Sequence, residues 1–131
     1  MTDALTVKDD SLAALVDEQG VSTLLKPLIR EIYLFDSYVA GTTHLQDASV
    51  LDTVREGDKL LLQREQQNRF DAKAIAVCTQ DGRKLGYVPE RDNLIFARLM
   101  DAGKVLSARI SGIRVKGTFH EIGIGIYLMD F

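Results

Sequence analysis

The sequence predicts a mainly β (α+β) domain, built as a small, partly open β-barrel of about six strands with one helix between the fourth and fifth strands. Two observations predict this class. Short runs rich in β-branched, aromatic and leucine residues recur along residues 32–128 and are separated by glycine-containing turns. A single stretch among them, residues 91–103, instead spaces its apolar side chains three and four apart, as a helix does.

Residues 1–34 are expected to form an acidic, helical extension before the barrel domain, which takes residues 35–131. Ser11–Glu18 begins with a serine that can cap a helix, continues with strong helix formers and is followed by a glycine that can end it. Ser22–Ile32 resumes a helical pattern, in which Pro27 removes a backbone donor and favours a break or a first-turn position.

The first strand of the barrel is expected at Ile32–Ala40, which is rich in β-branched and aromatic residues. Gly41 then bends the chain, and residues 48–55 are a candidate helical turn. Leu60–Arg64 is the next apolar run and predicts the second strand.

Two turns then connect three strands in succession. The polar turn Gln66–Asp71 separates the second strand from Ala74–Cys78, which resumes an extended, apolar pattern. Asp81-Gly82 predicts a tight hairpin turn, because glycine accepts the positive φ that such positions need. Leu85–Val88 follows as a strand, and Pro89 ends it because proline cannot donate to a sheet.

The helix is expected at Arg91–Gly103. Asp92 or Asn93 can cap its start, and the terminal glycine can end it. Phe96 and Met100 are interpreted as core residues on residue type. The expected buried stripe is Leu94, Ile95, Ala97, the stem of Arg98, Leu99 and Met100.

Two long strands close the sequence. Val105–Val115 alternates in character, Lys116-Gly117 turns the chain, and Ile122–Leu128 returns with isoleucines on one face. Gly123 and Gly125 leave the other face nearly bare, which favours a strong bend over a close approach by another backbone. The complete pattern is close to the barrel of oligonucleotide-binding (OB) proteins.

Charge is divided unevenly along the chain. The net charge is -3, but residues 1–60 hold 5 Lys/Arg and 11 Asp/Glu, a net of -6, whereas residues 61–131 hold 11 and 8, a net of +3. The positive half permits a weak contact with a polyanion.

Several classes of protein are excluded. No apolar run approaches the roughly 18 to 20 residues that span a bilayer, and no basic and apolar leader begins the sequence, so we expect no membrane partner and a cytoplasmic location. Cys78 is the only cysteine, which excludes an internal disulfide, and its apolar neighbours favour a buried, inert thiol. One cysteine with the separated His44 and His120 cannot supply a zinc site, so neither a metal nor another cofactor is expected.

Catalytic motifs are missing as well. The sequence has no Gly-x-Ser-x-Gly elbow, no phosphate-binding loop and no paired-histidine metal motif. We therefore do not expect an enzyme.

A binding surface is the remaining possibility. Phe70 and Tyr87 are candidates for stacking on bases, and Asn68 with Asp71 for hydrogen bonds to a sugar or a base edge. The alternative is that both rings belong to the core, that the two polar side chains only close a turn, and that the basic residues form a solvated face. The candidates for phosphate contacts are Arg64, Arg69, Lys73, Arg83 and Lys84.

At these residues the sequence resembles the HIRAN domain family, in particular its compact bacterial and phage-type proteins without an attached helicase. The resemblance runs in order from about Phe35 to Val115. Its motifs are Val39-Ala-Gly41, Leu60 to Glu65, Asn68-Arg-Phe-Asp71, Lys73-Ala-Ile75, Leu85-Gly-Tyr-Val-Pro89 and Asn93 to Gly103.

The resemblance implies an OB-like barrel that binds DNA. In helicase-linked eukaryotic members the pocket takes the 3′ end of a single strand at damaged or stalled forks. Asn68, Phe70 and Asp71 match the family's Asn-x-Tyr-Asp turn, with phenylalanine replacing the usual tyrosine, and Tyr87 matches a pocket position.

The sequence also departs from the family pattern. Thr43-His44 stands where the family has an aromatic pair, so only His44 can stack there. Glu90 stands where a basic residue is common, which weakens an expected phosphate contact.

The leading hypothesis is a non-catalytic nucleic-acid-binding module that holds single-stranded DNA or DNA ends, in DNA repair or replication-fork processing, with a helicase or nuclease as a further candidate partner. The alternative is a protein-interaction domain of OB-like fold, on which the acidic N-terminal helices dock and in which DNA binding has been lost. The predicted DNA-binding residues are Thr43, His44, Arg64, Asn68, Phe70, Asp71, Lys73 and Tyr87.

Overall fold

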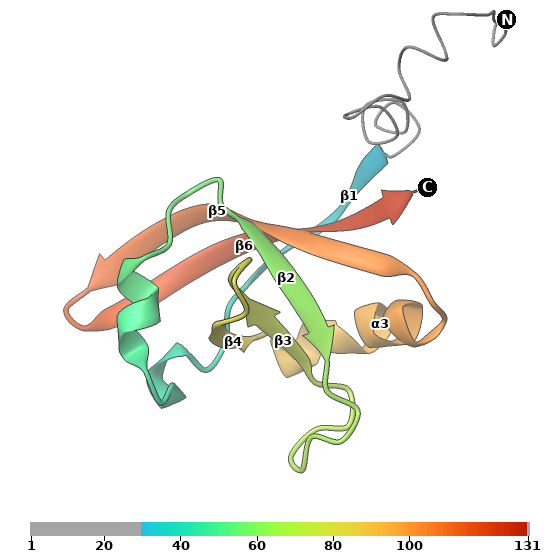
Figure 1. Cartoon of the computed structure of the whole chain (residues 1–131), viewed down its shortest axis with the longest axis horizontal. Coiled ribbons are helices and arrows are strands. Elements are labelled where there is room, and N and C mark those ends of the chain that lie inside the picture. The colour runs from blue at the N-terminus through green and yellow to red at the C-terminus, as the bar shows by residue number, and fades with distance from the viewer. Residues whose placement is uncertain (1–29, 131) are drawn as a thin grey trace, which may run out of the picture. The chain divides into compact units, whose positions relative to one another are not determined.

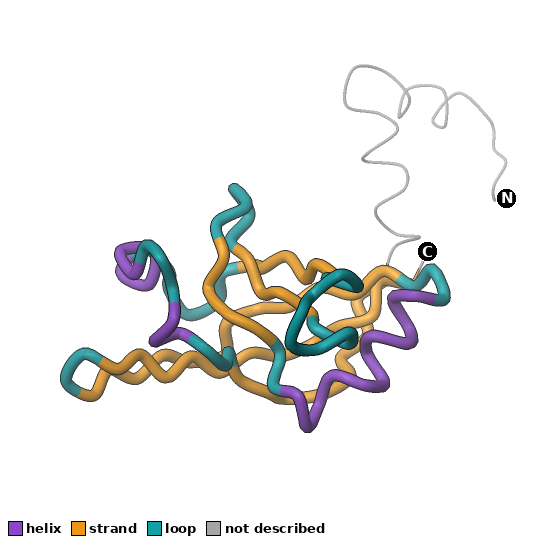
Figure 2. Tube along the Cα trace, turned by 90° about the horizontal axis from the view of Figure 1, so that it is seen from below, coloured by secondary structure: helices purple, strands orange, loops and turns teal. Residues whose placement is uncertain are grey.

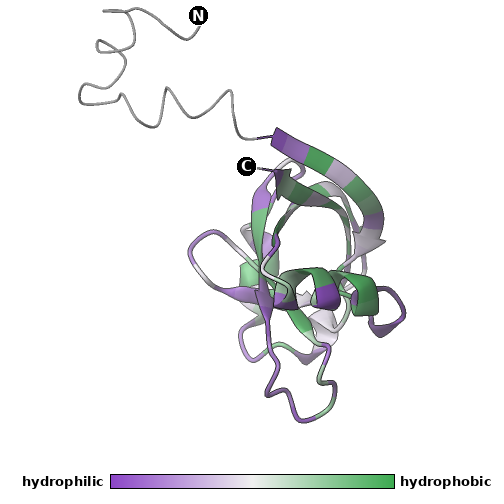
Figure 3. Cartoon of the chain, turned by 90° about the vertical axis from the view of Figure 1, so that its right-hand side faces the viewer, coloured by the Kyte–Doolittle hydropathy of each residue, from purple (hydrophilic) through white to green (hydrophobic). Residues whose placement is uncertain are grey.

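Six strands form one antiparallel sheet in the order β1-β6-β5-β2-β3-β4, which curls into a partly open barrel and confirms the predicted fold class. The computed structural model describes residues 30–130 (Figure 1), and Glu31–Met129 form one compact unit. The helices expected within residues 1–29 lie outside the described residues. Figure 3 shows the strands curving around one interior.

The first strand, β1, spans Arg30–Tyr38. The strand therefore begins two residues before the expected start at Ile32, so Arg30 and Glu31 belong to the sheet. Two short 3-10 helices follow, η2 at Thr42–His44 and η3 at Ala48–Asp52, and η3 confirms the expected helical turn.

Two hairpins join the central strands, as predicted. β2 (Lys59–Arg64) pairs with β3 (Ile75–Cys78), and β3 pairs with β4 (Lys84–Tyr87). Gly82 has φ 92° in the second turn, a conformation that glycine adopts without strain. Cys78 is buried in β3, as expected, and burial raises the pKa of its thiol.

The barrel closes where Ala40 pairs with Tyr87 of β4. The Ala40 N–H donates to the Tyr87 carbonyl at 2.7 Å, and the Tyr87 N–H donates to the Ala40 carbonyl at 2.8 Å. This approach requires Gly86, since a Cβ atom there would lie 2.6 Å from Val39 Cγ1 and closer still to the Ala40 carbonyl oxygen.

The two longest strands, β5 (Val105–Lys116) and β6 (Phe119–Asp130), form a hairpin that extends past the rest of the sheet (Figure 2). Their pairing shifts register between Ile110 and Gly112, where Gly112 pairs with Gly123, and such a bulge bends a strand. One face of the hairpin supplies much of the core, which confirms the predicted alternation. The largest fully buried side chains of this face are Ile110, Ile122, Ile124 and Ile126.

The helix α3 spans Glu90–Asp101 between β4 and β5. Its start differs from the prediction, because Pro89 occupies the N-cap position without a side-chain cap. Its end agrees with the prediction: Gly103 has φ 94°, its N–H donates to Met100, and the Lys104 N–H donates to Leu99, which is a Schellman motif. Within residues 30–130, no helix combines the length and apolar composition that crossing a bilayer requires.

The predicted buried face of α3 is partly wrong. Leu94 is 43% exposed and Ile95 is 67% exposed, whereas Asn93, Phe96 and Ala97 are buried. Phe96 lies against Phe35 of β1 with ring centroids 5.8 Å apart. The helix is turned so that a polar side chain faces inward, which residue type alone does not indicate.

Replacing Gly86 by alanine should lower the free energy of unfolding by at least about 2 kcal/mol, because the added Cβ overlaps the backbone that closes the barrel. Urea denaturation measures this change. Gly112→Ala is the matched control, since a Cβ at Gly112 meets open space and should change stability by less than about 0.5 kcal/mol. Equal stability of the two variants would contradict the proposed closure.

Candidate functional site

The loop between β2 and β3 is held by the side chain of Asn68. Its Oδ1 accepts hydrogen bonds from the backbone N–H groups of Phe70 (2.8 Å) and Asp71 (3.0 Å). Asparagine favours such turns because its short side chain reaches the backbone two residues on. The turn presents Phe70 almost fully to solvent, 93% exposed, so the core alternative is wrong for this ring.

Asp71 ties the same loop to α3. One carboxylate oxygen accepts the backbone N–H of Lys73 at 2.9 Å, and the other accepts the side-chain amide of the buried Asn93 at 2.8 Å. The hydrogen bond from Lys73 lowers the pKa of Asp71, and this effect together with the bond from Asn93 outweighs partial burial. Asp71 therefore stays ionised and anchors the loop.

A second network fixes Tyr87 to the loop through Glu65. The Tyr87 hydroxyl and the Asn68 side-chain amide both donate to Glu65 Oε1, at 2.8 and 3.0 Å. Lys84 Nζ donates to Glu65 Oε2 and to the Tyr87 hydroxyl, each at 2.8 Å, and lies 4.7 Å from the centre of the Tyr87 ring. One carboxylate thus couples Tyr87 to the turn that carries Phe70.

Burial and hydrogen bonding act in opposite directions on Glu65. Partial burial tends to raise the pKa of its carboxyl, but the hydrogen bonds from Lys84, Asn68 and Tyr87 together hold that pKa below its ordinary value. The bond to Glu65 also raises the pKa of Lys84. Both groups are therefore charged at neutral pH.

Phe70 and Tyr87 line one pocket of about 380 Å³, together with the predicted polar residues Asn68 and Asp71. We call it the Phe70 pocket. Its volume is at the small end of the range for ligand pockets. Its lining residues are Ala40, Gly41, Asn68, Phe70, Asp71, Ala74, Tyr87, Val88 and Glu90.

Two further pockets adjoin the Phe70 pocket and share residues with it. The His44 pocket, of about 590 Å³, shares Gly41 and Tyr87 and also contains His44. The Phe119 pocket, of about 280 Å³, shares Ala40 and Gly41 and contains Phe119 and Tyr38. Thr43 lines this third pocket and not the other two, so the structure separates it from His44.

The predicted basic residues fall into two groups. Arg64 forms a two-bond ion pair with Asp101, at 2.9 and 3.0 Å, and donates to the carbonyls of Ala72 and Ala74. Its side chain is 13% exposed, so Arg64 fastens the loop to the end of α3 and is not placed for a ligand. Arg69 and Lys73 are exposed beside Phe70, and neither side chain takes part in an ion pair within residues 30–130.

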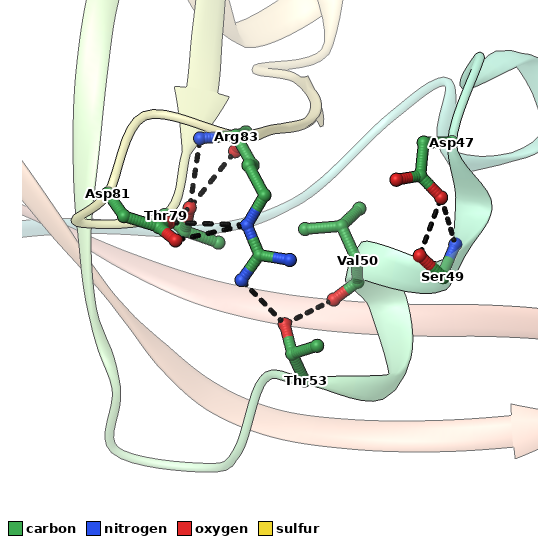
Figure 4. Close-up of polar contacts among 7 residues, drawn as sticks. All are labelled: Asp47, Ser49, Val50, Thr53, Thr79, Asp81 and Arg83. Atoms are coloured by element: carbon green, nitrogen blue, oxygen red, sulfur yellow. Dashed lines mark hydrogen bonds and ion pairs between the residues drawn. The ribbon is translucent and has the colours of Figure 1, made fainter.

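Arg83 also has an internal role (Figure 4). Its Nε atom pairs with Asp81 at 3.1 Å, and Nη2 donates to the Thr53 hydroxyl at 3.4 Å. The Thr53 hydroxyl in turn donates to the carbonyl of Val50 at 2.7 Å. Arg83 thus joins the β3–β4 turn to the end of η3, and this contact positions one wall of the His44 pocket.

Three participants were missed by the sequence analysis. Glu65 belongs to the motif Leu60 to Glu65, and its position three residues before Asn68 could have indicated that the two side chains meet across the loop. Asn93 was considered only as a helix cap. No feature of the sequence indicated a role for Phe119. Its pocket also contains Tyr38, the last residue of β1, which is far from Phe119 in the sequence.

Comparison with known proteins identifies the family. The sequence model of the HIRAN domain matches residues 32–127, well over half of the chain. The chain belongs to the HIRAN domain family. The family is generally one of DNA-binding modules, in agreement with the expected non-enzymatic role at that level.

Solved structures show the same HIRAN fold. A protein from Lactobacillus plantarum, structural genomics target LpR91B, superposes with a TM-score of 0.73 at 29% identity, covering 79% of this chain and 99% of that one. The HIRAN domain of human HLTF superposes with a TM-score of 0.62 at 16% identity, covering 76% and 79%. The NMR structure of the HLTF HIRAN domain superposes with a TM-score of 0.53, also at 16% identity. A search of curated protein sequences finds no significant match.

Replacing the Glu65 carboxylate by an amide should lower the free energy of unfolding at pH 7 by about 1–2 kcal/mol, because Lys84 loses its charged acceptor and the hydrogen bonds from the Tyr87 hydroxyl and the Asn68 amide then go to an uncharged oxygen. Glu65→Gln keeps the shape and loses the charge. Since the folded pKa of Glu65 is depressed, its contribution is complete above the unfolded value of about 4.3 and is lost as the pH falls through the folded pKa. The difference in stability between wild type and Glu65→Gln should therefore be largest at pH 7 and shrink at pH 3, as measured by urea denaturation. A difference independent of pH would contradict this role.

Proposed function

We propose that this HIRAN domain is a non-catalytic module that holds single-stranded DNA, with a free 3′ hydroxyl end in the Phe70 pocket. The observation that supports this most directly is the Phe70 ring, which is 93% exposed on a loop braced by Asn68 and lines one pocket with Tyr87. Burying such a ring against a base gains about 1–3 kcal/mol, and stacking tolerates any base.

The distribution of charge agrees with a nucleoside inside the Phe70 pocket and phosphates outside it. Among the described residues that line the Phe70 pocket, the charged ones are Asp71 and Glu90, and carboxylates accept hydrogen bonds from sugar hydroxyls. Arg69 and Lys73 lie on the same loop outside the pocket lining, where they can meet the backbone of a bound strand. Arg64 is left out of this proposal because its guanidinium is engaged with Asp101.

The adjoining pockets give the strand a route away from its end. His44 offers a stacking ring in one of them, and Tyr38 with Phe119 offers two in the other. A module that holds a strand end suits a place in DNA repair or replication-fork processing beside a helicase or nuclease.

A protein-interaction role is the second candidate, and α3 is the feature that favours it. Leu94 and Ile95 are exposed, and Arg91 and Arg98 flank them on the same face at helical spacing. Apolar side chains between exposed cations are a common feature of contact surfaces for acidic partners.

Phe70→Ala and Tyr87→Ala should each weaken binding of a labelled ten-nucleotide single strand by on the order of tenfold, through lost stacking. Fluorescence anisotropy at low salt measures the affinity. Tyr33→Ala is the matched control, because Tyr33 is 53% exposed and is not part of the Phe70 pocket. If the double variant Phe70→Ala/Tyr87→Ala kept wild-type affinity, the pocket would not be the binding site, and no binding by wild type would favour the interaction role.

Lys73→Gln should reduce the dependence of binding on salt. Each phosphate contact contributes roughly 0.7 to the slope of log affinity against log salt for a single strand, so the slope should fall by about that amount. Lys59→Gln is the control, since Lys59 is exposed at the opposite end of β2 from the loop. An unchanged slope for Lys73→Gln with a reduced slope for Lys59→Gln would place the DNA backbone elsewhere.

A further inference from the structure

Glu90 gives the Phe70 pocket a charge pattern that bears on which strand ends it accepts. Glu90 is exposed and lines the pocket, as does the ionised Asp71. None of the pocket's described lining residues is a lysine or an arginine. Lys84, the cation nearest to Tyr87, is neutralised by its contact with Glu65 at 2.8 Å.

The start of α3 would otherwise favour an anion here. The first residues of a helix carry unpaired N–H groups and a partial positive charge, so phosphates bind at such ends. In this chain the first helical residue is itself acidic, and Glu90 brings its carboxylate to the end of the helix that borders the pocket. Asp92, the other acidic residue of this turn, accepts a hydrogen bond from Ser37 of β1 at 2.9 Å. Glu90 is therefore the residue of the turn whose charge acts on a ligand in the pocket.

We infer that Glu90 is a specificity-determining residue, which excludes a strand end that carries a terminal phosphate and admits one that carries a hydroxyl. This inference rests on the proposed function and names a determinant for the same pocket. A terminal phosphate would place up to two negative charges between Asp71 and Glu90, whereas a hydroxyl is neutral and can donate to either carboxylate. Glu90 acts on the end group, and the stacking of the base on Phe70 and Tyr87 does not depend on it.

The test compares two oligonucleotides, each ten thymidines long and labelled at the 5′ end, one ending in a 3′ hydroxyl and the other in a 3′ phosphate. Affinities are measured by fluorescence anisotropy for the full chain as wild type, Glu90→Gln and Glu90→Lys. Glu56→Gln is the matched control, because Glu56 is an exposed glutamate outside the pocket lining. Thermal unfolding of each variant verifies that it is folded.

The decisive quantity is the ratio of the two affinities, because a general change in attraction to DNA cancels in it. Glu90→Gln should improve binding of the phosphate end by about fivefold, as expected for removing one unit-charge repulsion at about 4 Å in water, and binding of the hydroxyl end by less than about twofold. Glu90→Lys should shift the ratio further in the same direction, and Glu56→Gln should leave it unchanged.

Two results would overturn the inference in distinguishable ways. If wild type binds the hydroxyl end but the ratio is the same in all three Glu90 forms, the proposed function stands and Glu90 has no part in selecting the end. If wild type binds neither oligonucleotide at low salt, the proposed function itself fails, and the role of Glu90 fails with it.

Discussion

Two backbone hydrogen bonds between Ala40 and Tyr87 hold the candidate binding surface together. β1 and β4 are the two outer strands of the sheet. The two hydrogen bonds join Ala40, which follows β1, to β4 and so close the barrel. The contact depends on Gly86, where any side chain would overlap the backbone of Ala40. The same contact brings Ala40, Gly41 and Tyr87 into the wall of the Phe70 pocket. The residues that close the barrel therefore also line the pocket.

The carboxylate of Glu65 links the Ala40–Tyr87 contact to the β2–β3 loop. Through Tyr87 it is connected to the β4 strand that pairs with Ala40, and through Asn68 to the turn that presents Phe70. Asp71 adds a second connection, to Asn93 inside α3. A loop that exposes an aromatic ring would ordinarily lose entropy on binding, and bracing it beforehand reduces that cost.

Three of the five basic residues that were candidates for phosphate contacts are used to build the surface. Arg64, Arg83 and Lys84 are each engaged in contacts with neighbouring carboxylates. The exposed cations nearest to Phe70 in sequence are Arg69 and Lys73. In a chain of net charge -3, Arg69 and Lys73 are therefore the cations of this loop that internal pairing leaves exposed within the described residues.

The sequence by itself determined the strands, both central hairpins, the helix between β4 and β5, and the association of Asn68, Phe70 and Asp71 in one turn, because these features depend on alternation and turn chemistry between near neighbours. Only the tertiary structure decided which face of α3 is buried, that Arg64 pairs with Asp101, and that Thr43 and His44 line different pockets. It also decided that Glu65 joins Tyr87 to the loop. Each of these depends on partners far apart in the chain, 22 positions for Glu65 and Tyr87 and 37 for Arg64 and Asp101, and no local pattern encodes which distant groups meet.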